Sequence, residues 1–173
     1  MNSYLLLFNW PSVSYASKEA LNTKLFLSPE ISIKDSRVLS TRNLVSTLKS
    51  LQKPPATLLS ASAIGFYGNC KPVELYESLE PGHGFLADVC KEWEHEAFIA
   101  KKHNIRTIAL RIGLVLGYEG GAMKKMIPPF WAGLGGDLGD GTQWMSWIHV
   151  KDLVDMIIHS IENKSIEGSY NAV

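Results

Sequence analysis

The fold is decided by residues 57–68, TLLSASAIGFYG, where a short apolar run ends in small hydroxyl side chains and glycines. A buried parallel strand has this composition, because both of its faces are covered, and glycines mark the loop that follows. We therefore expect a strand over Thr57–Ser62, followed by a loop that contains Gly65 and Gly68.

On either side of this strand, the hydrophobic pattern predicts an alternation of helices and strands. From Asp35 to Leu51 apolar residues recur at three- and four-residue steps, and Pro54-Pro55 ends the predicted helix. The other predicted elements are strands at Tyr4–Phe8, Arg106–Ile112 and Ser169–Val173, and helices at Phe85–His103, near Ala122–Trp131 and at Val150–Ile161. This order indicates an α/β fold with a mostly parallel sheet covered on both faces. Residues 12–34 are too polar and irregular for a prediction.

Composition limits the class of protein. The 173 residues are 46% hydrophobic and 20% charged, which suits one globular domain. Lys+Arg and Asp+Glu number 17 each, so we expect small-molecule or protein partners rather than nucleic acid or a membrane. The run at Tyr4–Phe8 is too short to span a bilayer. Cys70 and Cys90 suit neither a disulfide framework nor a CxxC pair, so we expect free thiols and a cytoplasmic location.

Five segments, taken in order, carry a family resemblance that no single segment establishes. They are KDSRVLSTRNLVSTL (34–48), LLSASAIGFYG (58–68), GFLADVCKEWEHEA (84–97), the long run from ALRIGLVLG to WIHVKDL (109–153) and GSYNAV (168–173). Together they resemble an epimerase-like branch of the extended short-chain dehydrogenase/reductase superfamily, whose members are labelled nucleoside-diphosphate-sugar epimerase or cell-division-inhibitor-like. The resemblance is clear over residues 35–173 and weak over residues 1–34.

The resemblance implies a doubly wound, NAD(P)-binding Rossmann-type domain, of which residues 1–173 form a single incomplete copy. Its phosphate-binding loop, GxGxxG or GxxGxxG, does not occur in the sequence. We therefore expect a chain truncated at both ends that lacks the first strands of the sheet. The strand at Tyr4–Phe8 would then be an exposed parallel edge. Association through that edge, or completion by the missing N-terminal half, is expected.

The same resemblance suggests which residues lie beside the substrate. In relatives, a Ser or Thr hydroxyl after this strand donates a hydrogen bond to the reacting oxygen; Ser62 is the first candidate here and Ser60 the alternative. Without the resemblance, serines at a strand end would only satisfy loop backbone groups. Tyr67 follows directly and is expected to line the substrate pocket. Its Tyr-x-x-x-Lys spacing to Lys71 lies in a loop and is attributed to chance.

The acid/base pair of the superfamily is expected to be absent. Relatives carry a Tyr and, four residues later on the same helix face, a Lys that binds the cofactor ribose. The helix anchored by Trp93-Glu94 has Leu86 and Cys90 at those positions. Lys91 cannot replace the lysine, because one residue turns a side chain by about 100° around a helix.

Residues 111–117, RIGLVLG, resemble the segment that runs past the nicotinamide. Gly113 would allow close approach of the cofactor, and the predicted cofactor contacts are Ser60, Arg111, Gly113 and Leu114. The alternative is a core strand that ends in an ordinary glycine turn. Arg111 is either a cation at the solvent edge or a group that orients a nearby carboxylate or phosphate.

Other polar features receive structural interpretations. The glycine-rich residues 120–141 form either a mobile cover of the substrate region or tight turns, and Trp147–Asp152 is expected to begin the last helix, with His149 in a structural hydrogen bond. The five histidines show no metal-binding spacing, so no metal is expected. Glu74, Glu77 and Glu80 are expected on solvated surface.

Two functions remain open from the sequence. One is an NADP(H)- or NAD(H)-dependent epimerase or oxidoreductase acting on a sugar nucleotide or a related carbonyl compound, with this chain alone expected to be inactive. The other is a non-catalytic fragment or a regulatory module derived from an NADP-binding domain.

Overall fold

The computed structural model describes residues 4–7 and 29–173 except 71–72, 119, 137–139 and 142–143. Its main sheet has four parallel strands in the order β1-β2-β3-β6. Their bounds are β1 Tyr4–Leu7, β2 Thr57–Ala63, β3 Arg106–Ile112 and β6 Gly168–Ala172. The predicted strands are confirmed with ends shifted by one residue at most, except that Phe8 lies outside the described residues.

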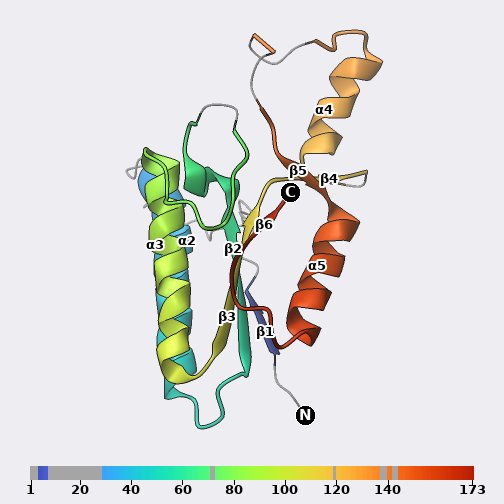
Figure 1. Cartoon of the computed structure of the whole chain (residues 1–173). Helices are drawn as coiled ribbons and strands as arrows, with labels where there is room; N and C mark the ends of the chain where they lie inside the picture. The colour runs from blue at the N-terminus through green and yellow to red at the C-terminus, as the bar shows by residue number, and fades with distance from the viewer. Residues whose placement is uncertain (1–3, 8–28, 71–72, 119, 137–139, 142–143) are drawn as a thin grey trace, which may run out of the picture.

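Helices cover both faces of this sheet, as predicted (Figure 1). One face is covered by α2 (Pro29–Ser50) and α3 (Phe85–Phe98), and the other by α5 (Val150–Glu162). The 3-10 turns η1 (Ile64–Tyr67) and η2 (Ile99–His103) follow β2 and α3. The helix expected from Asp35 begins earlier, at Pro29, and the one expected over Phe85–His103 is α3 completed by η2.

A second, two-stranded sheet was not predicted. It consists of β4 (Leu114–Gly117) and β5 (Trp147–His149), which pair in parallel. Residues Trp147–His149, expected to lead into the last helix, therefore form a strand, whereas α5 begins at Val150 as predicted for the helix Val150–Ile161. His149 caps this helix: its Nδ1 accepts a hydrogen bond from the Lys151 backbone N–H at 3.3 Å, so its structural role is confirmed. Helix α4 (Gly121–Trp131) projects beyond the sheet above this small sheet (Figure 1).

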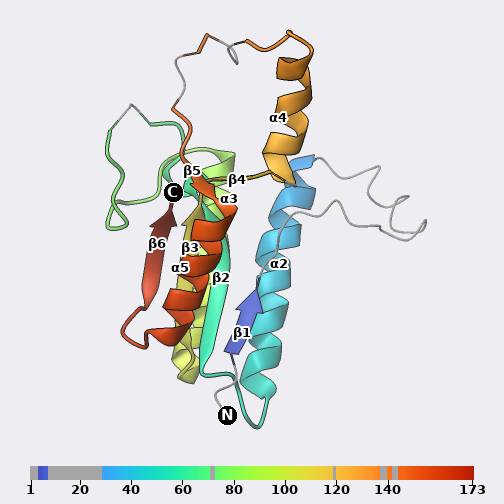
Figure 2. The same cartoon turned by 90° about the vertical axis from the view of Figure 1, so that its right-hand side faces the viewer.

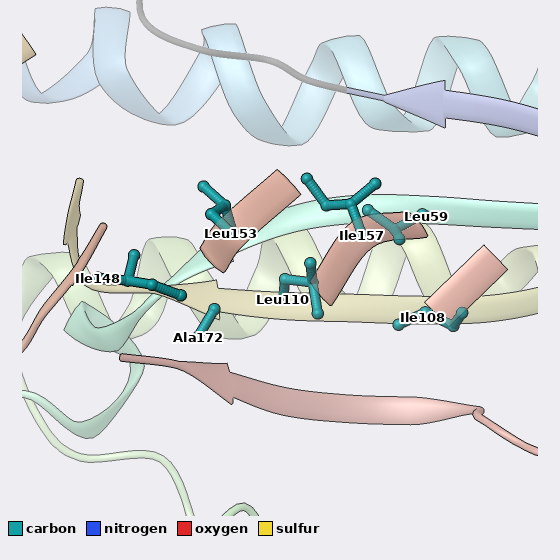
Figure 3. Close-up of a cluster of buried hydrophobic side chains, with 7 residues drawn as sticks. All are labelled: Leu59, Ile108, Leu110, Ile148, Leu153, Ile157 and Ala172. Carbon is teal, nitrogen blue, oxygen red and sulfur yellow. The ribbon is translucent and has the colours of Figure 1, made fainter. Parts of the chain in front are cut away.

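Side-chain alternation along β3 separates the core into two halves. Ile108 and Leu110 point toward α5, whereas Arg111 points toward α3. The α5 half is an apolar cluster drawn in Figure 3 and made of Leu59, Ile108, Leu110, Ile148, Leu153, Ile157 and Ala172. Burying each of its larger aliphatic side chains stabilises the fold by about 1.5–3 kcal/mol. The α3 half becomes polar toward the carboxyl ends of the strands, and the candidate site lies there.

Candidate functional site

Three polar side chains form a row across the sheet near the carboxyl ends of its strands. Ser62 of β2 is in register with Arg111 of β3, and Arg111 is in register with Asn171 of β6. Residues in register on neighbouring strands point to the same face of a sheet, and for this row it is the face covered by α3. In open parallel sheets this end of the strands is where ligands bind.

Glu94 of α3 lies over the row and binds its central member. The Arg111 Nε donates to Glu94 Oε1 at 2.9 Å and the Arg111 Nη2 to Oε2 at 3.0 Å. Both side chains are buried, with 5% and 7% of their surface exposed. The Ser62 hydroxyl donates to Oε1 at 2.6 Å and the Ser169 hydroxyl to Oε2 at 3.1 Å. The carboxylate of Glu94 thus accepts four hydrogen bonds from three strands.

Tyr67 closes the network from the η1 side. Its hydroxyl accepts from Arg111 Nη1 at 2.9 Å and donates to Asn171 Oδ1 at 2.7 Å. The Arg111 guanidinium also lies 3.5 Å from the centre of the Phe66 ring, a cation–π contact. Burial lowers the pKa of Arg111, but the hydrogen bonds to Glu94 and Tyr67 outweigh burial and raise it above its ordinary value, so the guanidinium stays charged.

The loop over residues 73–80 is fastened to the same network. Arg111 Nη1 donates to the Glu77 carbonyl at 3.2 Å, and Asn171 Nδ2 donates to the Leu75 carbonyl at 2.9 Å. The Glu77 carboxylate accepts a hydrogen bond from the Asn171 backbone N–H at 2.9 Å. The expectation that Glu77 is merely solvated surface is therefore incomplete, because its exposed side chain also holds the end of β6.

Of the predicted catalytic residues, Ser62 and Tyr67 are brought into one network, but neither is accessible. Ser62 is 3% exposed and Tyr67 is 5% exposed. The Ser62 proton is committed to Glu94, and the Tyr67 proton to Asn171. A hydroxyl has one proton to donate, so neither can donate to a substrate oxygen without releasing its present partner.

Of the predicted cofactor residues, Ser60 and Arg111 are buried, whereas Gly113 and Leu114 are half-buried. Ser60 is 1% exposed and its hydroxyl donates to the Ala61 carbonyl at 3.0 Å. Arg111 is 4% exposed, so the solvent-edge alternative is wrong, and the carboxylate that it orients is Glu94. A Cβ on Gly113 would lie 2.7 Å from the Ser146 carbonyl oxygen, so the backbone that approaches this glycine is the protein's own. Leu114 begins β4, and its N–H donates to the same carbonyl at 2.9 Å.

The two positions where relatives carry the Tyr/Lys pair differ in exposure. Leu86 is 57% exposed at the start of α3, whereas Cys90 is buried one turn later, against Phe66 and Tyr67. Burial, assisted by the charge of Glu94, raises the pKa of the Cys90 thiol to about 11. Neither side chain supplies an acid or base at neutral pH.

The region between β4 and β5 exposes large apolar side chains. Tyr118, Trp131, Leu134 and Trp144 each expose 78% or more of their surface. In the part of the chain that the structure describes, no group of three or more His, Cys, Asp or Glu side chains could hold a metal ion. The same described residues contain no helix with the length and apolarity needed to cross a membrane.

The central residue of the network was missed from the sequence. In the sequence, Glu94 only marks which helix corresponds to the Tyr/Lys helix of relatives. Ser169 and Asn171 lie in a predicted strand, and no local pattern gives them a role. A glutamate next to a tryptophan on an amphipathic helix gives no local signal of burial. Its burial could be inferred only by knowing that β3 brings an arginine beneath the same helix, and this is information about tertiary structure.

Comparison with known proteins finds one matching family. The model of the NAD dependent epimerase/dehydratase family matches residues 22–172. Among curated proteins, the chain is 43% identical over 148 residues to an Arabidopsis thaliana protein named "Epimerase family protein SDR39U1 homolog, chloroplastic". It is 38% identical over 139 residues to an epimerase family protein of Staphylococcus aureus.

Solved structures give the same result. A nucleoside-diphosphate sugar epimerase from Corynebacterium glutamicum is 39% identical, with a TM-score of 0.72, over 83% of this chain and 31% of that chain. Human epimerase family protein SDR39U1, solved with NADPH, is 28% identical, with a TM-score of 0.75, over 83% of this chain and 49% of that chain. The chain spans 42% and 46% of the length of the two curated relatives.

Proposed function

The chain belongs to the NAD dependent epimerase/dehydratase family, and from this premise we propose that the whole protein is a nicotinamide-dependent epimerase or oxidoreductase. Its substrate is a sugar nucleotide or a related carbonyl compound, and its cofactor is NADP(H). The relative solved with NADPH is 28% identical, whereas the epimerases solved with NAD are 20–22% identical, and this difference favours NADP(H) over NAD(H).

The observation that carries the proposal is the polar row Ser62–Arg111–Asn171 at the carboxyl ends of three parallel strands. Sheets of this kind bind ligands at that end, and a buried charged network there fixes the strand ends rigidly. Rigid strand ends keep the neighbouring backbone in place for a bound ligand. A polar row at this end of the strands is therefore more typical of a preorganised binding site than an apolar core is.

The described residues offer a surface for the nicotinamide end of a dinucleotide. The backbone at residues 63–65 and 112–114 is half-buried at the ends of β2 and β3, and it can contact a flat nicotinamide ring. Arg111 is not available to a pyrophosphate, because all three of its guanidinium nitrogens already have protein partners. We therefore propose that Ser60, Gly113 and Leu114 shape the surface that contacts the nicotinamide. Arg111 contributes indirectly, because it orients Glu94 and so fixes the strand ends. The phosphates are proposed to bind elsewhere.

Ser62 and Tyr67 are proposed to orient the site rather than to exchange protons. Breaking the 2.6 Å bond from Ser62 to Glu94 would leave a buried carboxylate with one partner fewer, which costs about 1–3 kcal/mol. Leu86 instead offers an apolar surface at the position where relatives carry a tyrosine. Proton transfer in this protein would then depend on the substrate or on a residue other than the usual pair.

Turnover assays test this function, with a protein that contains this chain and has the full length of its relatives (the family-length protein). NADPH oxidation and inversion at a sugar carbon are measured with a panel of sugar nucleotides and simple carbonyl compounds. We expect NADPH-dependent conversion of at least one compound, and Ser62→Ala to lower it less than about tenfold. A protein that binds no nicotinamide nucleotide and converts none of these compounds would contradict the proposal.

The state of the two cysteines is the basis for proposing a cellular compartment. Cys70 and Cys90 are both free, and Cys90 is buried without a partner sulfur, which suits a reducing compartment such as the cytoplasm. The Arabidopsis relative is named chloroplastic, so measuring the distribution of a tagged protein between cytoplasm and organelles tests this proposal.

A further inference from the structure

The loop between η1 and α3 stands at the carboxyl end of the main sheet. Figure 2 shows this loop beside the end of β6, the strand that carries Asn171. The base of the loop is closed on η1, where the Gly82 N–H donates to the Phe66 carbonyl at 2.9 Å. A Cβ on Gly82 would overlap the Tyr67 carbonyl oxygen, so the backbone approaches here as closely as only glycine allows. The base of the loop is therefore held by η1 and not by the strands.

The tip of the loop, residues 73–80, has little apolar packing of its own. All of its residues except Leu75 are exposed. Leu75 packs against the small cluster of Phe66, Tyr67 and Cys90. Ordering an exposed segment costs conformational entropy, and one half-buried leucine offsets only part of that cost. The tip consequently depends on polar contacts to keep its position.

Asn171 joins the tip to the polar row through both its side chain and its backbone. Its Nδ2 donates to the Leu75 carbonyl at 2.9 Å, and its backbone N–H donates to the Glu77 carboxylate at 2.9 Å. Its Oδ1 accepts the Tyr67 hydroxyl at 2.7 Å. Because a carbonyl can only accept, the side-chain nitrogen must face Leu75 and the oxygen must face Tyr67. An amide can make both bonds, whereas a carboxylate has no donor for Leu75.

We infer that Asn171 is a positioning residue of the proposed reaction, because it holds residues 73–80 as one wall of the substrate site. In open parallel sheets ligands lie beyond the carboxyl ends of the strands, and the tip flanks that end of β6. Loops that contact ligands are commonly held in place by a rigid scaffold, and the buried network around Arg111 is such a scaffold. Asn171 acts through the loop rather than on the reacting atoms. The inference rests on the proposed function and adds to it the loop and the residue that holds it.

Asn171→Asp in the family-length protein tests this role. The aspartate keeps an oxygen for Tyr67 but turns a second oxygen, instead of a donor, toward the Leu75 carbonyl. We expect amide exchange in residues 73–80 to become at least about tenfold faster. For a compound that the wild-type protein converts, KM should rise at least about fivefold, with kcat and the NADPH dissociation constant within about twofold of wild type. General loosening of the fold would instead change all three.

The matched control is Asn163→Asp. Asn163 uses its Oδ1 as an acceptor, from the backbone N–H and the hydroxyl of Ser165, and an aspartate keeps that oxygen. The same chemical change should therefore leave KM and the exchange of residues 73–80 within about twofold of wild type.

Glu77 gives a second test that leaves the buried network unchanged, because its side chain is exposed. Glu77→Ala removes the acceptor of the Asn171 N–H, whereas Glu77→Gln keeps an oxygen at that place. We expect the alanine variant to raise KM at least about twofold, and the glutamine variant to stay close to wild type.

Unchanged exchange in residues 73–80 or an unchanged KM in Asn171→Asp would overturn the inference, and so would a Glu77→Gln variant that behaves like Glu77→Ala. These comparisons are made between variants of a protein that turns over. A wild-type protein that converts no compound is a different result, because it contradicts the proposed function itself and the inference with it.

Discussion

Arg111 and Glu94 form a two-point ion pair in the interior, with Nε to Oε1 at 2.9 Å and Nη2 to Oε2 at 3.0 Å. Arg111 belongs to the central strand β3, and Glu94 belongs to the helix that covers it. Through Ser62 and Ser169, the same carboxylate also holds β2 and β6. One side chain of α3 thus holds three neighbouring strands of the sheet together.

Replacing Glu94 with Gln should therefore strongly destabilise the protein. The substitution keeps the shape but leaves the Arg111 charge buried without its counter-ion, a loss of about 3–5 kcal/mol. Urea unfolding monitored by circular dichroism measures it. Glu92→Gln is the matched control, since Glu92 forms a half-exposed pair with Lys34 and should cost about 1 kcal/mol or less. Equal urea midpoints for the two variants would show that the buried ion pair contributes no more to stability than the half-exposed one.

Gly113→Ala should loosen the junction between the two sheets. The added Cβ would lie 2.7 Å from the Ser146 carbonyl oxygen, so β5 or the end of β3 must shift, at a cost of about 1–3 kcal/mol. Gly136→Ala meets no atom within 4 Å and serves as the control. Thermal unfolding should show a clear decrease for the first variant and almost none for the second; the reverse order would contradict the described packing.

The two thiols should differ widely in reactivity. With a pKa of about 11 and a buried side chain, Cys90 is about one part in a thousand thiolate at pH 8, whereas Cys70 is exposed. A colorimetric thiol reagent should label one cysteine quickly and the other only on unfolding, and Cys70→Ser should remove the fast phase. Two fast phases in the native protein would mean that Cys90 is accessible.

The raised pKa of the Cys90 thiol also predicts how the free energy of unfolding depends on pH. An unfolded thiol ionises near pH 9 and the folded one near pH 11, so the unfolded state binds fewer protons between these values. The contribution of Cys90 to the free energy of unfolding is complete below pH 9 and declines from pH 9 to 11. A Cys90→Ala variant, although less stable, should show a shallower decline over that window.

Arg106→Lys should destabilise the end of α5. The guanidinium nitrogens Nη1 and Nη2 donate to four backbone carbonyls at the end of this helix and beyond, those of Ser160, Ile161, Asn163 and Ile166. A lysine has three donors and no planar fork, so at least one carbonyl loses its partner, at about 1–3 kcal/mol. Faster amide exchange confined to the last turn of α5 and residues 163–166 is the expected signature. Unchanged exchange there would contradict the capping role.

The sequence predicted the main sheet and its helices because their hydrophobic periods are long and regular. It missed β4 and β5, which have four and three residues and pair with each other across 29 intervening positions, too short and too distant for a local pattern. Ser62, Tyr67 and Arg111 were predicted as site residues, and the structure brings them into one hydrogen-bonded network. Their inward orientation could not be foreseen, because it depends on Glu94, whose burial is a consequence of tertiary packing.

NADPH binding decides whether this fold serves a nicotinamide cofactor. Calorimetric titration of the family-length protein with NADPH, and separately with NADH, gives both affinity and preference. We expect saturable one-site binding of NADPH, at least about tenfold tighter than binding of NADH. Absence of binding for both nucleotides by a protein that is folded by circular dichroism would contradict the claim that this fold serves a nicotinamide cofactor.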